Sequence, residues 1–130
     1  MNDRIRSYFD EIEARLIECP AILDYQITRR DISPEDGKLR IKSTLTGNGV
    51  FECFLYVKNK GSHIQSLRYS FHWQDAEGKL VKRLDNAPHH IDLPYAPHHL
   101  HTGAGHVEGF SGNPDILAFI DDMERTLIRK

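Results

Sequence analysis

Residues 50–74 read VFECFLYVKNKGSHIQSLRYSFHWQ. Polar and apolar residues alternate through Ile64–Gln74, which predicts a strand that is covered on one face only. Val50–Val57 is apolar or aromatic on both faces, as is typical of a central strand. A polar turn at residues 59–61 separates the two. The stretch therefore predicts two antiparallel neighbours in the middle of a sheet.

The segments before this stretch extend the same pattern. Residues 3–18 carry apolar side chains every three or four positions, which predicts an amphipathic helix that Pro20 ends. Alternating apolar residues then predict strands at Ile22–Arg30 and Lys38–Thr46, with a turn at residues 33–37 between them. The sequence Gly-Asn-Gly at 47–49 is typical of a hairpin and leads into the central strand.

The segments after it predict one further strand and a second helix. Lys79–Asp85 follows a turn and has strand character. The second helix is expected to begin at Asn113 as N-cap, with Pro114 in its first turn and Asp115 near the positive end of its dipole. The prediction is an α+β fold, an antiparallel meander of about five strands packed with an N-terminal and a C-terminal helix. A length of 130 residues suits a single domain over residues 1–130.

Alternation also separates core from surface on the predicted strands. Leu67, Tyr69, Phe71 and Trp73 share the face expected in the core, with Cys53 of the neighbouring strand as a small core residue. The opposite face of Ile64–Gln74 is polar. With two cysteines in different contexts, the chain shows no disulfide framework.

Charge and hydropathy exclude several classes of protein. Seventeen basic and nineteen acidic residues give a formal net charge of −2, which does not favour a generic nucleic-acid binder. Eight histidines can add local positive charge, so contact with RNA is left to a local patch. No apolar run approaches the roughly 18 residues of a membrane span, and no signal-peptide core is seen. We expect a cytoplasmic protein that does not bind membranes.

Five of the eight histidines fall within residues 85–101, DNAPHHIDLPYAPHHLH. Three prolines in this segment exclude a regular helix or a central strand and predict a shaped loop. Loops that collect titratable groups on a rigid scaffold are often functional sites. The histidines are His89, His90, His98, His99 and His101.

Three interpretations of this histidine cluster compete. A polar surface loop is the first. A zinc or nickel site is the second, with His90, His99 and His101 as the first ligands to test, since positions i and i+2 of an extended segment point to the same side. Acid/base chemistry without a metal or other cofactor is the third, with one imidazole removing a proton and another donating one. We favour the third.

The residues near the loop supply the other groups that RNA cleavage needs. We expect His90 to pair with His99 or His101 as acid and base, and Asp85 to orient an imidazole. Asn86 could donate to an oxyanion, although Asp85 and Asn86 are also a natural turn pair. The expected phosphate-binding side chains are Arg68, His72 and Arg83.

The segments YSFHWQDAEGKLVKRLDNAPHH and LPYAPHHLH, within Tyr69–His101, resemble the TumE family, the toxin halves of small type II toxin–antitoxin modules. The resemblance extends from about Ile22 to the C-terminus. It implies a growth-inhibiting toxin, expected to be a ribonuclease acting on cellular RNA and neutralised by a cognate protein antitoxin. The resemblance points to the same histidine-rich segment, residues 85–101, but assigns no role to its individual residues. A metal-dependent hydrolase or nuclease and a non-enzymatic binding module stay open as alternatives, as does a homodimer.

Overall fold

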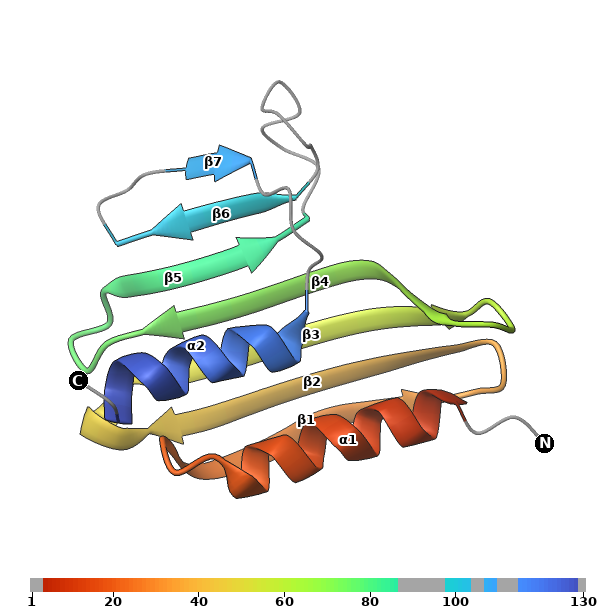
Figure 1. Cartoon of the computed structure of the whole chain (residues 1–130), viewed down its shortest axis with the longest axis horizontal. Coiled ribbons are helices and arrows are strands. Elements are labelled where there is room, and N and C mark those ends of the chain that lie inside the picture. The colour runs from red at the N-terminus through yellow and green to blue at the C-terminus, as the bar shows by residue number, and fades with distance from the viewer. Residues whose placement is uncertain (1–3, 87–97, 104–106, 110–114, 129–130) are drawn as a thin grey trace.

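The computed structural model describes residues 4–86, 98–103, 107–109 and 115–128. Its strands form one antiparallel sheet in the order β1-β2-β3-β4-β5-β6-β7, so that every strand pairs with its neighbours in sequence (Figure 1). The elements are α1 (Arg4–Glu18), β1 (Ile22–Ile32), β2 (Asp36–Leu45), a 3-10 turn (Thr46–Asn48), β3 (Val50–Asn59), β4 (Ile64–Gln74), β5 (Leu80–Asp85), β6 (His99–Thr102), β7 (Val107–Gly109) and α2 (Ile116–Ile128).

The predicted α+β meander with a helix near each end is confirmed, but the sheet is larger than expected. Within the described residues it has seven strands instead of about five, because β6 and β7 extend it beyond β5. Strands of four and three residues are too short for alternation to reveal. The predicted loop at 85–101 therefore ends in a strand at His99, while residues 87–97 lie outside the described residues.

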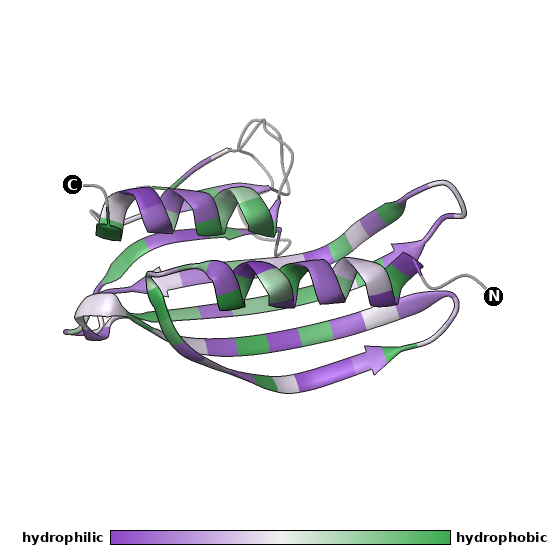
Figure 2. Ribbon diagram, turned by 60° about the horizontal axis from the view of Figure 1, so that its bottom comes forward, coloured by the Kyte–Doolittle hydropathy of each residue, from purple (hydrophilic) through white to green (hydrophobic). Residues whose placement is uncertain are grey.

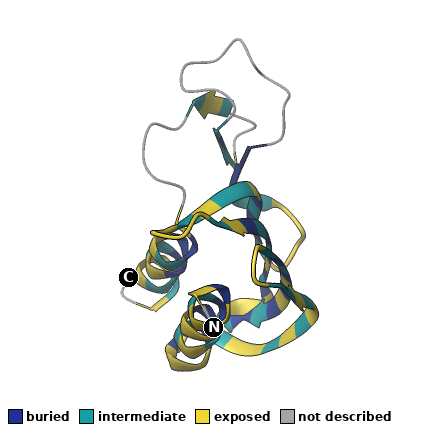
Figure 3. Cartoon of the chain, turned by 90° about the vertical axis from the view of Figure 1, so that its right-hand side faces the viewer, coloured by how far each residue is buried: buried dark blue, intermediate teal, exposed yellow. Residues whose placement is uncertain are grey.

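Both helices lie on the same face of the sheet, and the core fills the space between them and the strands (Figures 1 and 3). Figure 2 shows how hydrophobic and hydrophilic residues alternate along the strands beneath them. The ring of Phe119 in α2 lies 5.6 Å from that of Phe51 and 5.7 Å from that of Phe71. The predicted core positions of Cys53 and Trp73 are confirmed. The buried core includes Ile5, Phe9, Ile12 and Leu16 of α1, Leu39, Ile41 and Leu45 of β2, Phe51, Cys53, Leu55 and Val57 of β3, Tyr69, Phe71 and Trp73 of β4, Leu84 of β5, and Ile116, Phe119, Ile120 and Met123 of α2.

Polar contacts fix the ends and the pairing of the helices. The predicted cap residues Asn113 and Pro114 lie outside the described residues, but the carboxylate of Asp115 accepts the N–H of Leu117 at 3.0 Å. Asp115 therefore caps α2, because an N-cap side chain satisfies a backbone donor of the first turn. Arg15 of α1 connects the helices through ion pairs with Asp121 and Glu124 of α2.

The other face of the sheet carries the alternate side chains, and no helix in the described part of the chain lies over it (Figure 3). We call this surface the open face. It is polar with two aromatic residues, and its composition follows from strand alternation. Its side chains include Asp24, Gln26, Arg29 and Asp31 of β1, Lys38, Arg40 and Lys42 of β2, Glu52, Phe54 and Tyr56 of β3, Arg68, Ser70, His72 and Gln74 of β4, Arg83 and Asp85 of β5, and His99 and His101 of β6.

Candidate functional site

Strand register brings several of the predicted site residues together. Asp85 of β5 stands opposite His99 of β6. Arg83, two residues earlier, stands between His72 of β4 and His101 of β6. Residues opposite each other in antiparallel strands share a face of the sheet. Three strands thus place these five side chains next to one another on the open face.

The carboxylate of Asp85 is the centre of this group, although its side chain is only 3% exposed. Arg83 Nε donates to Asp85 Oδ2 at 2.8 Å. His101 Nε2 lies 3.4 Å from the same oxygen, and His99 Nδ1 lies 3.6 Å from Oδ1. A buried carboxylate is costly unless it is paired, and here a guanidinium and two imidazoles surround it. We call Arg83, Asp85, His99 and His101 the Asp85 cluster.

The Asp85 cluster extends to His72 through the guanidinium of Arg83. Arg83 Nη1 lies 3.2 Å from His72 Nδ1, and His72 Nε2 lies 3.0 Å from Gln74 Oε1. Arginine can only donate, so Nδ1 of His72 must accept, and its proton sits on Nε2 and points at Gln74. His72 therefore donates from Nε2 to Gln74 on the open face and accepts at Nδ1 from Arg83.

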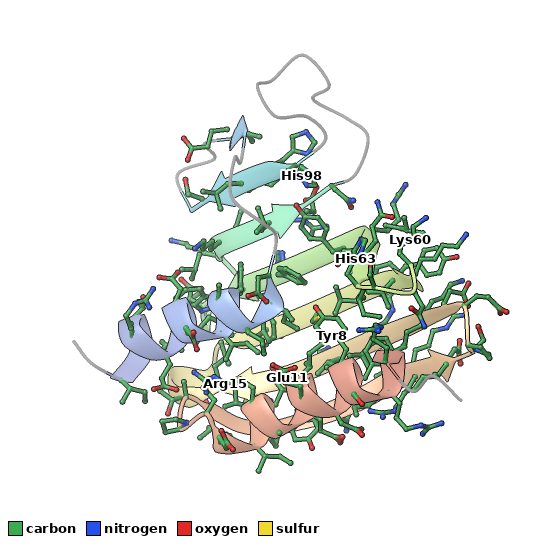
Figure 4. The ribbon with its side chains drawn as sticks, turned by 45° about the vertical axis from the view of Figure 1, so that its right-hand side comes forward. Tyr8, Glu11, Arg15, Lys60, His63 and His98 are labelled. Carbon is green, nitrogen blue, oxygen red and sulfur yellow. The ribbon has the colours of Figure 1, made fainter. Side chains whose placement is uncertain are left out.

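His98 is separated from the Asp85 cluster by strand alternation. Its Nδ1 lies 2.8 Å from the hydroxyl of Tyr69, a core residue, and the two rings stack with centroids 5.8 Å apart. Burial, reinforced by the nearby charge of Asp85, raises the pKa of Tyr69 well above its ordinary range, so its hydroxyl keeps its proton. Figure 4 shows His98 at the start of β6 and His63 beside Lys60 in the β3–β4 turn. The five predicted histidines are therefore not one cluster.

Asn86 is committed to the backbone of β4. Its Oδ1 accepts the N–H of Tyr69 at 3.0 Å, and its Nδ2 donates to the carbonyl of Leu67 at 2.9 Å. The residue is 8% exposed. The side-chain amide thus continues the pairing of β4 with β5 where the backbone ladder ends, which is a structural role for this residue.

A groove of about 400 Å³ lies on the open face beside the Asp85 cluster. Arg83 of the cluster lines this groove, as does His72, which contacts Arg83. Arg40, Glu52, Phe54 and Gln74 line it without having been expected as site residues. Alternation along β2, β3 and β4 places them on this face, but only the register shows that Glu52 stands opposite His72 and that Arg40 and Phe54 lie in the next cross-strand row. The lining residues are Arg40, Glu52, Cys53, Phe54, Ser70, His72, Gln74 and Arg83.

The remaining predicted residues lie at the margin of this site or outside it. Arg68 is exposed on β4 opposite Tyr56, one cross-strand row away from the groove. His89 and His90 lie outside the described residues. Within the described residues no group of three or more His, Cys, Asp or Glu side chains has the geometry to hold a metal ion. Of the three metal ligands expected from the sequence, His99 and His101 are described and His90 is not.

A family model for the toxin TumE matches residues 12–128. The chain belongs to the TumE toxin family. Comparisons with curated proteins and with solved structures find no match. Membership in the TumE family gives the protein a toxin role and implies an antitoxin as its partner. In the part of this TumE-family chain that the structure describes, no helix is long and apolar enough to cross a membrane.

Proposed function

We propose that this TumE-family protein is the toxin of a type II module and that it cleaves cellular RNA by acid/base catalysis at the Asp85 cluster. The observation that supports this best is the placement of a buried carboxylate among two imidazoles and a guanidinium, beside an open groove. A cytoplasmic location is part of the proposal, since cellular RNA is found there. The cognate antitoxin would neutralise this activity.

The proposed reaction needs a base, an acid and a cation. A neutral imidazole removes the proton of a 2′-hydroxyl, the freed oxygen attacks phosphorus, and the bond from phosphorus to the 5′-oxygen breaks. A protonated imidazole gives its proton to that leaving oxygen, so the products are a 2′,3′-cyclic phosphate and a 5′-hydroxyl. Arg83 supplies positive charge for the phosphoryl oxygens.

Exposure distinguishes the two histidines of β6. The side chain of His101 is 16% exposed and that of His99 is fully buried. We therefore assign His101, with the predicted His90 as its counterpart, to proton transfer. His99 becomes a positioning residue, which packs against the His101 ring with centroids 6.3 Å apart. Asp85 orients His101, as carboxylates do for catalytic imidazoles.

The test is cleavage of a labelled RNA by purified His101→Gln and His90→Gln variants, with growth inhibition as a second readout. Each variant is expected to lose about 10²–10⁴-fold in rate, the usual contribution of one acid or base. His63→Gln is the matched control, because His63 contacts Ser62 in a turn remote in sequence from the cluster. If His101→Gln keeps full activity, the assignment of His101 to proton transfer is wrong.

Elemental analysis and an assay with and without EDTA separate the alternatives. Cleavage that survives EDTA in metal-free protein supports imidazole catalysis. Stoichiometric zinc or nickel, with activity lost on chelation and restored by one metal, would instead make the histidines ligands of a hydrolase or nuclease. Growth inhibition without any cleavage would favour a binding module.

A further inference from the structure

The open face is basic although the chain is not. Its basic side chains form cross-strand rows, with Lys38 and Arg68 on either side of Tyr56 and Arg40 beside Phe54. Many of the chain's acids lie on the helices of the opposite face. These acids are Asp10, Glu11, Glu13 and Glu18 of α1 and Asp121, Asp122 and Glu124 of α2. Against these seven acids the described helices carry four basic residues, Arg4, Arg6, Arg15 and Arg125, so the helix layer is net acidic while the open face is net basic. A net charge of −2 for the whole chain does not show this difference.

Two aromatic rings lie within the basic rows. Arg40 Cζ lies 4.6 Å from the centroid of Phe54, and Lys38 Nζ lies 5.3 Å from that of Tyr56. Both rings are half-buried on a face without a covering helix in the described chain. Proteins that bind a single strand stack its bases on aromatic rings or guanidinium planes and hold its phosphates with nearby cations.

Phe54 also lies close enough to the Asp85 cluster for one RNA strand to contact both. Phe54, Ser70 and Asp85 follow one another across β3, β4 and β5 in a single row. Neighbouring strands lie about 4.8 Å apart, so roughly 10 Å separates Phe54 from Asp85 along this row. The groove runs between them, since Phe54 and Arg83 both line it.

We propose that the open face binds single-stranded RNA, with bases stacked on Phe54 and Tyr56 and phosphates held by Lys38, Arg40 and Arg68. This rests on the proposed function for the cleavage step and adds the substrate class and its binding residues. A duplex does not fit the arrangement, because its bases are stacked inside the helix and cannot reach rings on a sheet. Glu52 is the carboxylate in the groove, and it works against RNA binding.

The experiment is fluorescence anisotropy with a short labelled RNA whose 2′-oxygens are all methylated, which removes the nucleophile and keeps bases and phosphates. Phe54→Ala and Tyr56→Ala are each expected to weaken binding about tenfold, the usual effect of losing one base stack. Ile17→Ala removes an exposed apolar side chain from α1, in the helix layer, and serves as the control, with wild-type affinity expected. Glu52→Gln should bind more tightly, and a duplex of the same sequence more weakly. Thermal melting of each variant, with Phe54→Leu as a milder second change, verifies folding.

The outcomes separate this proposal from the ribonuclease function. If folded Phe54→Ala and Tyr56→Ala bind like wild type, or if the duplex binds as tightly as the single strand, the open face is not the RNA platform. Cleavage of ordinary RNA by wild type would then still support the ribonuclease. Ring-dependent binding without any cleavage would support the platform and refute the cleavage step.

Discussion

Asn86 and Asp85 are adjacent in sequence, and the structure gives them different tasks. Both were expected in the site, with a turn as the alternative for the pair. Asn86 has its side-chain amide on the backbone of β4, whereas Asp85 faces Arg83, His99 and His101. Their sequence neighbourhood could not distinguish these roles, because the difference depends on which face each residue occupies after the strands pair. We therefore expect stability effects at Asn86 and activity effects at Asp85.

Replacing Asn86 by Ala should destabilise the fold by about 1–3 kcal/mol, because it leaves the buried N–H of Tyr69 and the carbonyl of Leu67 without their partners. Urea denaturation measures this change in the free energy of unfolding. Asn59→Ala is the control, since the amide of Asn59 bonds at an exposed turn. Equal losses for the two variants would show that Asn86 does not hold β4.

Replacing Asp85 by Asn should lower the rate of RNA cleavage by about 10²–10⁴-fold. The amide has the same shape as the carboxylate, but it can neither stabilise a protonated His101 nor form an ion pair with Arg83. A cleavage time course with wild type and variant at equal concentration measures the loss. Asp75→Asn is the control, because Asp75 caps a turn through backbone N–H groups. If the two variants cleave equally fast, Asp85 has no part in the reaction.

At the scale of elements, periodicity predicted most of what the structure contains. The central strand β3 and its neighbour β4 begin where their patterns begin, and α1 follows its apolar stripe. What periodicity could not predict is pairing beyond β5. β6 is short and lies next to a proline-rich segment, and it is the strand that brings His99 and His101 to Asp85. The residue types of the site were therefore predictable, and their geometry was not.

The link between α1 and α2 depends on the guanidinium of Arg15. Arg15 contacts Asp121 through two nitrogens and Glu124 through one, at 2.8 to 3.1 Å. Its side chain is 22% exposed, so we expect Arg15→Ala to cost about 1 kcal/mol, at the upper end of the range for partly exposed pairs. Arg15→Lys should recover only part of this, because an ammonium cannot make the forked contact. Thermal unfolding at low and high salt measures both, and a melting temperature unchanged in Arg15→Ala would contradict the link.

The turn between β1 and β2 should make stability depend on pH in the acid range. Hydrogen bonds from Ser33 and Tyr56 lower the pKa of Asp36 below its ordinary value of 3.8. A lowered pKa means that the folded state favours the ionised form, so this stabilisation is present above pH 3.8 and is lost as the pH falls through the folded pKa. The difference in unfolding free energy between wild type and Asp36→Asn should thus shrink below pH 3.8. A difference that stays constant from neutral pH into this range would show that the charge of Asp36 does not matter.

At the scale of the whole molecule, the meander gives a protein with net negative charge one basic face, which is the proposed surface for RNA. Both helices pack on one face, and many of the acids are found there. Alternation then directs the basic residues of β2 and β4, together with Arg83 of β5, to the open face, where the Asp85 cluster also lies. The helix layer and the open face thus differ in net charge, and the average charge of the chain describes neither.

This separation predicts a steep salt dependence for RNA binding. Each phosphate contact with a single strand contributes about −0.7 to the slope of log affinity against log salt concentration. Arg68→Ala should reduce the magnitude of the slope by about 0.7, because it removes one such contact from the open face. Arg125→Ala removes the same charge from the helix layer, where the side chain is 61% exposed and pairs with Asp122, and should leave the slope unchanged. Anisotropy titrations at several salt concentrations measure both slopes. If the two variants reduced the slope equally, RNA would respond to the total charge of the molecule, and the open face would have no special role in holding the strand.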